Sequence, residues 1–389
     1  MLLKFRPGFS LLPFLCLCTL VSALLQPAEA RAAGAIPTPD ELDSIFAFRG
    51  IVYKQEDDNG KGGNPSVDEY ATIYEGIWLF QHRLNDTQAA RFKFTGDLVT
   101  AASYDDAREK AETVSGATGY NPGRFNLDFG WKYRSYERFG LELHASYGQE
   151  YAYRSFGYGM SVSQSFAEEA TQLSASVQVY DDTVRMIRFD GSKQHDEPRK
   201  TYSGSLNLTQ TLTPRSLMNA SWSHSEQNGM LATSFNSVLI NDVRDIEITP
   251  DVRVRDTLSL RYKHAIDEDS IQLGYSYYED SWDIRADVAE VRYILNFVGG
   301  SLVLEPSYRY YTQKGAEFFA FEFDVAEPLR SSDSDLGNFD GHSTGLLFPA
   351  WQPGWFTDSL TRYDLGFNYY RRSDDLDFYW LTVGWYAPL

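Results

Sequence analysis

The chain of 389 residues contains only two cysteines, Cys16 and Cys18, and both lie near its start. They fall inside an apolar stretch typical of the central part of a secretion signal, so we expect the mature chain to contain no cysteine. This excludes a disulfide framework, a thiol nucleophile and a thiolate metal site as the basis of its function. An exported envelope protein is compatible with that absence.

Long apolar runs and clusters of basic residues are also missing. Beyond the first stretch, no uninterrupted apolar run approaches the roughly 18 residues of a helical membrane span. The chain has 35 basic and 54 acidic residues, for a net charge of −19. Phosphate binding needs clustered Lys and Arg, so nucleic acid is excluded as a partner.

The first 30 residues have the three parts of an export signal. Lys4 and Arg6 supply the positive charge, residues 10–21 are apolar, and Ala28-Glu29-Ala30 is a small-residue cleavage site. We therefore predict a cleaved signal peptide at 1–30, a periplasmic lead-in at 31–45, and a single outer-membrane domain at 46–389. The signal predicts Sec-type export of the chain.

The remaining chain is dominated by strict alternation of apolar and polar side chains. Phe92, Phe94 and Leu98, for example, alternate with Arg91 and Lys93. A period of two is the strand period, because successive side chains point to opposite faces. Aromatic residues make up 15% of the chain, which favours the aromatic girdles of a membrane barrel.

We predict an all-β fold, a single antiparallel transmembrane β-barrel of about 16 strands (about 14–18). The predicted strands are 46–56, 69–83, 88–101, 124–136, 140–152, 156–167, 171–181, 201–212, 216–226, 257–266, 270–280, 285–297, 301–312, 341–349, 357–371 and 376–388.

The connections between these strands alternate in length. Short ones follow even-numbered strands and contain turn residues. Long ones follow odd-numbered strands, at 57–68, 102–123, 182–200, 227–256 and 313–340. Short periplasmic turns and long extracellular loops are typical of an outer-membrane barrel with both ends of the chain in the periplasm.

Several stretches of the second half are similar to one known family. They are SHSEQNG at 223–229, YSYYEDSWDI at 275–284, LEPSYRYYTQ at 304–313 and SSDSDL at 331–336. Together they resemble the bacterial outer-membrane family catalogued as domain of unknown function 3570, most strongly from 200 to 345. The resemblance implies a Gram-negative outer-membrane barrel and supplies no catalytic residues.

If the apolar set faces lipid, the alternate set faces the lumen. The lumen-facing candidates carry charges of both signs: Arg91, Lys93, Asp97, Arg261, Lys263, Glu290, Arg292, Glu305 and Arg309. Such charges persist where they are paired or wet. A closed barrel with charged ladders and a water-filled pore both satisfy this condition, so both stay open.

Residues 318–323 are too apolar for a freely solvated loop. One hypothesis is that Phe319, Phe321 and Phe323 form a constriction loop that folds into the barrel mouth. The alternative is that they extend the preceding hairpin above the membrane. The sequence favours neither.

Catalytic and metal-binding patterns are weak. His224 and Ser225 are adjacent, so on a strand they point to opposite faces and form no base–nucleophile pair. Residues 57–62 and 333–335 contain oxygen ligands for Ca²⁺, but neither has a full ligand register, and solvated hairpin tips are favoured. We predict no enzyme activity, no cofactor and no bound metal.

The leading functional hypothesis is a porin-like channel for polar solutes in the outer membrane. The alternatives are a non-transporting structural barrel or partner of another envelope component, and, less favoured, an outer-membrane hydrolase. Expected partners are outer-membrane lipid, lipopolysaccharide, the barrel-assembly machinery and a periplasmic protein bound at the short-turn side.

Overall fold

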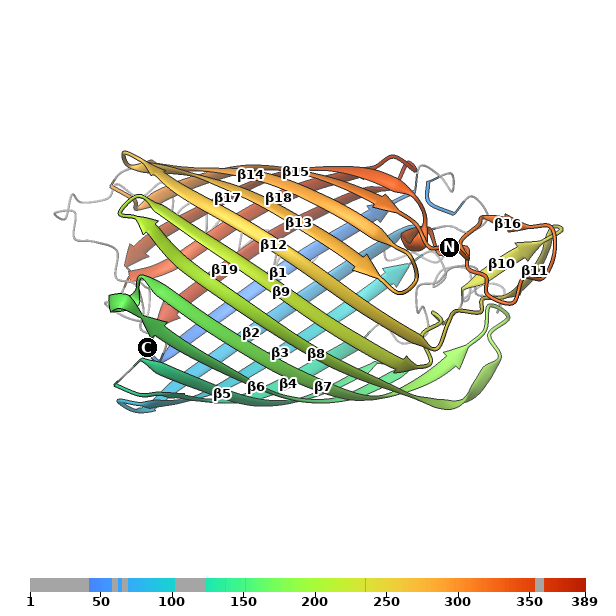
Figure 1. The fold of residues 1–389 in the computed structure, drawn as a ribbon, viewed down its shortest axis with the longest axis horizontal. Coiled ribbons are helices and arrows are strands. Elements are labelled where there is room, and N and C mark those ends of the chain that lie inside the picture. The colour runs from blue at the N-terminus through green and yellow to red at the C-terminus, as the bar shows by residue number, and fades with distance from the viewer. Residues whose placement is uncertain are drawn as a thin grey trace, which may run out of the picture.

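The computed structural model describes residues 42–57, 62–64, 69–101, 123–136, 138–150, 152–234, 236–297, 299–353 and 360–389. They form a closed ring of sixteen strands with a three-stranded sheet at one end (Figure 1). The prediction of a single antiparallel barrel of about sixteen strands is confirmed. The predicted signal peptide lies outside the described residues, among which no helix is long and apolar enough to cross a membrane.

The barrel strands are β1 (Ile45–Glu56), β2 (Ala71–Asn85), β3 (Gln88–Ala101), β4 (Gly123–Arg134), β5 (Phe139–Glu150), β6 (Tyr153–Phe166), β7 (Thr171–Ile187), β8 (Lys193–Thr213), β9 (Ser216–Gly229), β12 (Val252–Ile266), β13 (Asp269–Asp280), β14 (Arg285–Phe297), β15 (Leu302–Lys314), β17 (Phe339–Pro353), β18 (Leu360–Arg372) and β19 (Asp377–Pro388). Each overlaps one predicted strand. Each pairs with its neighbours along the chain, and β1 closes the ring on β19, where Ile45 lies opposite Pro388.

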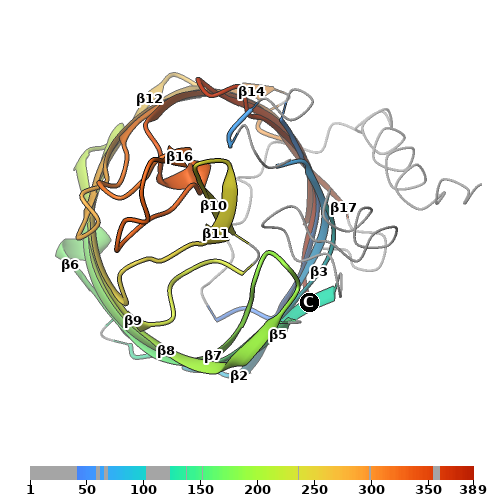
Figure 2. The same cartoon turned by 90° about the vertical axis from the view of Figure 1, so that its right-hand side faces the viewer.

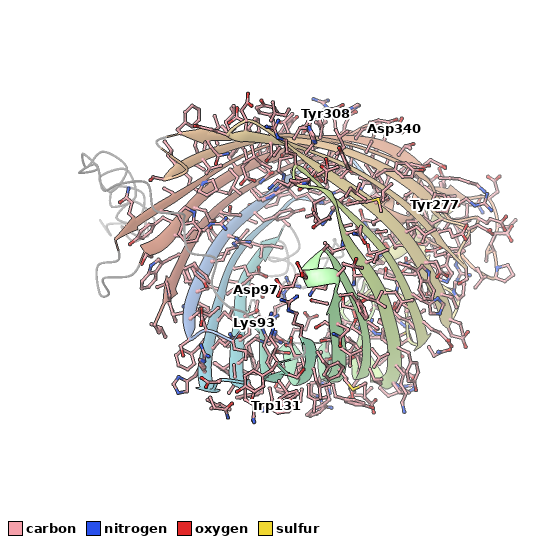
Figure 3. The ribbon with its side chains drawn as sticks, turned by 60° about the vertical axis from the view of Figure 1, so that its left-hand side comes forward. Lys93, Asp97, Trp131, Tyr277, Tyr308 and Asp340 are labelled. Carbon is pink, nitrogen blue, oxygen red and sulfur yellow. The ribbon has the colours of Figure 1, made fainter. Side chains whose placement is uncertain are left out.

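Side chains alternate between the two faces of this wall. On β12, Leu258 and Leu260 point outward and are 55% and 47% exposed, whereas the Ser259 hydroxyl between them lies 2.8 Å from that of Ser276 on the inner face. Figure 3 shows Lys93 on the inner side of the ring. The outer face is therefore apolar and the inner face polar, as the alternation predicts.

Connection lengths differ between the two ends of the barrel. At one end the strands are joined by short turns such as 86–87, 214–215 and 267–268, and by the 3₁₀ turn η1 (Ala167–Glu169). The other end carries the long connections 57–70, 230–251 and 315–338.

The predicted loop at 182–200 is wrong. Strand β7 continues to Ile187 and β8 begins at Lys193, so only residues 188–192 connect them. Arg185 and Asp196 pair across this extension, Nε to Oδ1 at 2.7 Å. Beyond the apolar band both faces of a hairpin meet water, so the alternation of apolar and polar residues ends while the backbone pairing continues.

The two longest described connections form a small sheet that the sequence did not predict. It consists of β10 (Ser237–Ile240), β11 (Val243–Ile246) and β16 (Glu322–Phe323), with β10 and β16 parallel. Viewed along the barrel axis, these strands lie inside the outline of the ring (Figure 2). We call residues 230–251 and 315–338 the lid.

Candidate functional site in the barrel interior

The inner wall over β3, β4 and β5 carries charges that pair across strands. Arg91 donates to Asp128 Oδ1 at 2.9 Å and lies 2.6 Å from Glu142 Oε1. Asp97 pairs with Arg124. Lys93 is opposite Asp128 in the strand register and forms no ion pair with a described residue. Figure 3 shows Lys93 and Asp97 facing the hollow of the ring.

The inner wall over β12 to β15 is more basic. Its inward-facing charges are the basic residues Arg253, Arg255, Arg261, Lys263, Arg292 and Arg309 and the acidic residues Asp280, Glu290 and Glu305. Arg292 lies 3.4 Å from both Glu290 and Glu305. Arg261, Lys263 and Arg309 have no ion-pair partner among the described residues, although the Arg309 guanidinium lies 6.0 Å from the centre of the Tyr311 ring.

Two of these arginines were missed because they precede the predicted strand 257–266. Arg253 donates twice to Asp280 Oδ2, at 2.8 and 2.6 Å, and its guanidinium lies 4.2 Å from the centre of the Trp282 ring. Arg255 donates to the amide oxygen of Gln227 at 2.6 Å. The alternation Val252, Arg253, Val254, Arg255 was the signal that could have extended the strand.

The phenylalanines of the candidate constriction loop lie in the lid. Strand β15 ends at Lys314, so these residues do not extend its hairpin. Phe319 and Phe321 pack edge to face at 5.0 Å, and Phe323 ends β16. Beneath them, Trp282, Ile284, Ala316 and Leu336 form a buried cluster that Phe318 and Phe319 contact.

Polar contacts fasten the lid to the end of β18 and to the connection 57–70. Arg372, at the end of β18, is 3% exposed and donates to Asp335 Oδ1 at 2.5 Å, to the Ser334 carbonyl at 2.8 Å and to Asp374 Oδ2 at 2.6 Å. The Ser334 hydroxyl, in the short helix η2 (Ser334–Leu336), donates to Glu69 at 2.7 Å. The mouth on this side of the ring is therefore spanned by one connected unit.

The two halves of the lid are joined by a second set of contacts. Arg330 is 7% exposed and donates to Asp245 Oδ2 at 2.9 Å and to the Ile246 carbonyl at 3.1 Å. The Ser331 hydroxyl donates to Glu247, 2.5 Å away, and the Asn236 amide donates to Asp333 at 3.1 Å. Each half thus supplies the hydrogen-bond partners that the other needs.

Two carboxyl groups in the lid have raised pKa values. Burial raises the pKa of Glu247, and the hydrogen bond from Ser331 only partly offsets this. Burial, together with the charges of Asp335 and Glu247, raises the pKa of Asp333 to about 7. Protons therefore favour the docked lid.

Neither candidate Ca²⁺ segment forms a metal cluster among the residues that the structure describes. Asp333 and Asp335 take hydrogen bonds within the lid and from Arg372. Residues 58–61 lie outside the described residues.

His224 and Ser225 point to opposite faces of β9, as their adjacency in the sequence predicts. His224 lies 3.1 Å from Asp256 on the outer face, and the Ser225 hydroxyl accepts from Ser203 at 3.0 Å on the inner face. On the outer face, Ser216 Oγ lies 2.9 Å from His264 Nδ1, with the Tyr262 hydroxyl 3.1 Å from Ser216.

The family resemblance is confirmed. The model of the family described as protein of unknown function (DUF3570) matches residues 47–380. No curated protein sequence matches significantly. Among solved structures, a bacterial polysaccharide outer membrane secretin is similar, with a TM-score of 0.51 and 9% identity over 90% of this chain and 100% of that chain.

Two further solved structures resemble the chain more distantly. The outer membrane protein OpdK of Pseudomonas aeruginosa has a TM-score of 0.42 and 11% identity over 89% of this chain and 99% of that chain. The siderophore receptor PirA of Acinetobacter baumannii has a TM-score of 0.44 and 9% identity over 85% and 54% of the two chains. At these identities the likeness concerns the fold alone.

Proposed function

We propose that this chain, which belongs to the family described as protein of unknown function (DUF3570), spans the Gram-negative outer membrane as a passive channel for polar solutes. The outer wall supports the membrane location. Val177, Leu206 and Leu258 are each about half exposed on it, and an apolar surface of this extent is stable against acyl chains rather than water.

The channel is supported by one observation above all: charged side chains on the inner wall remain in contact with solvent. The side chains of Arg124 and Arg292 are 46% and 36% exposed, although both face the interior and form ion pairs there. Burying a charge in a dry packed core would cost several kcal/mol. A water-filled lumen, for which sixteen strands leave room, avoids that cost.

The position of the lid is evidence that the entrance to the lumen is narrow at this end of the barrel. Its two halves lie inside the outline of the ring (Figure 2) and are tied to β18 by Arg372. We therefore propose a conductance smaller than that of an open sixteen-stranded barrel, with fluctuations as the lid moves.

Single-channel recording tests this function. The mature chain is refolded into detergent, its folding is checked by the shift in gel mobility on heating, and it is added to a planar bilayer in KCl. Discrete current steps are expected. A correctly folded barrel that passes no current would overturn the channel.

A non-transporting barrel is the second candidate, and the lid favours it specifically, because several connections meet over the mouth. Such a barrel would be silent in the same recordings and would act through a partner, such as a periplasmic protein at the short-turn end. In either case we propose Sec-type export, insertion by the barrel-assembly machinery, contact with lipid and lipopolysaccharide, and no catalytic role.

A further inference from the structure

We propose that the inner wall over β12 to β15, beneath the lid, is a binding site for anionic solutes that carry several hydroxyl groups, such as sugar acids. The inference rests on the proposed channel function, because a solute must reach this wall through the lumen. It names the class of solute that the channel selects.

The first observation is a set of three arginines without carboxylate partners. Arg255, Arg261 and Arg309 face the lumen and form no ion pair with a described residue. By contrast, each arginine that faces the lumen over β3 and β4 forms an ion pair, such as that between Arg91 and Asp128. Arg261 and Arg309 are exposed to the lumen, so their unpaired charges can be reached by an anion from solution.

The second observation is that these arginines line two adjoining cavities, which share Arg253. The upper cavity, of about 300 Å³, lies between the wall and the lid and contains Arg255. The lower cavity, of about 450 Å³, contains Arg261 and Arg309. Each is within the size range of sites for small organic ligands.

Acidic residues also border both cavities, but most are engaged elsewhere. Glu290 pairs with Arg292, and Asp335 pairs with Arg372. Glu247 accepts hydrogen bonds from Ser331 and from the backbone of Thr233. These carboxylates leave the three arginines without a counter-ion.

The chemistry of the lining selects the class of solute. A guanidinium presents a planar fork of donors that matches a carboxylate. Thr257 and Ser276 line the lower cavity and offer partners for the hydroxyl groups of a solute. Coulomb attraction to the three unpaired arginines grows with the negative charge of the solute, so an anionic sugar should bind more tightly than a neutral one.

The test uses current block by matched sugars. Glucuronate, glucose and glucose 6-phosphate are added to the wild-type channel in a planar bilayer, and to the variant R255Q/R261Q/R309Q. Glucuronate and glucose 6-phosphate are both expected to interrupt the current at concentrations at least tenfold below that of glucose. The triple variant is expected to lose at least tenfold in apparent affinity for glucuronate.

Two controls make the result specific. Lys93→Gln removes an unpaired inward cation from the opposite wall and should leave block by glucuronate unchanged. The single variant R261Q replaces the triple variant if the latter fails to show the heat-dependent gel shift of a folded barrel.

The outcomes separate this inference from the channel function. A conducting channel that glucuronate and glucose block equally, or whose block survives the triple substitution, overturns the site. A folded barrel that carries no current overturns the channel. Calorimetry of glucuronate binding to that silent barrel in detergent would then decide the site, and no heat of binding would overturn it as well.

Discussion

One buried arginine joins the lid to the end of β18, so its removal should weaken lid docking and widen the mouth. Arg372 contacts the lid at Asp335 and the Ser334 carbonyl, and its own strand end at Asp374. Substitution by Met keeps the apolar stem against the Phe339 ring, 3.7 Å from the guanidinium in the wild-type chain, and removes the charge.

The expected effect comes mainly from the Ser334 carbonyl, because the other lid partner, Asp335, is 78% exposed. Ser334 is 3% exposed, and its carbonyl loses a charged donor in the variant. Leaving a buried acceptor without its donor costs about 1–3 kcal/mol. If this cost falls on lid docking, the ratio of docked to undocked lid falls by about 5- to 150-fold, since each 1.4 kcal/mol is a factor of about ten.

Single-channel recording and limited proteolysis both report on that ratio. Arg372→Met should raise the mean conductance and speed protease cleavage within 315–338, with the heat-dependent gel shift retained. Arg371→Met is the matched control, because the Arg371–Asp375 pair is more than half exposed at both ends and contributes little. Unchanged conductance and cleavage in Arg372→Met would refute the assignment of this arginine as the fastening of the lid.

Three further outcomes follow from particular contacts. Because the pKa of Asp333 is raised to about 7, its contribution to lid docking is complete below about pH 4 and is lost as the pH rises through 7. The single-channel conductance should therefore increase from pH 5 to 8, and a conductance that does not change with pH would contradict this. Gly229 has φ of +118°, and a Cβ there would collide with the Pro198 carbonyl, so Gly229→Ala should lower the free energy of unfolding by about 1–3 kcal/mol in urea titrations of the vesicle-inserted barrel. Arg91→Met should lower it by about 3–5 kcal/mol because two carboxylates lose their partner, whereas Lys93→Met should change it little; equal losses would show that the pairing is not the cause.

The strands could be predicted because the two solvents of a barrel wall impose a period of two on the sequence. Leu258, Ser259 and Leu260 show that alternation directly, and all sixteen strands overlap their predictions. Where the wall leaves the apolar band the constraint ends. The extension of β7 to Ile187 was missed for that reason.

The contacts of the candidate site could not be predicted from the sequence. The alternation of side chains along β3 predicts which face Arg91 is on. Its partner Asp128, however, lies 37 residues away, and only the register between the strands brings the two together. The lid depends on still longer separations, such as the 268 residues between Asn64 and Ser332, whose carbonyl accepts from the Asn64 amide at 2.8 Å. Strands as short as Glu322–Phe323 carry no periodicity from which to infer them.

The lid and the basic wall are mechanically connected, which bears on how a solute could influence the mouth. Arg253 is held by Asp280 and lies against the ring of Trp282, and that ring packs edge to face on Phe318 of the lid at 5.2 Å. The upper cavity, which contains Arg255, is also lined by the lid residues Glu247 and Asp333. Undocking of the lid should therefore change the affinity for glucuronate, and a ligand shifts an equilibrium by its difference in affinity for the two states. The apparent affinity for glucuronate should then differ between Arg372→Met and the wild-type channel, and equal affinities would show that the wall and the lid act independently.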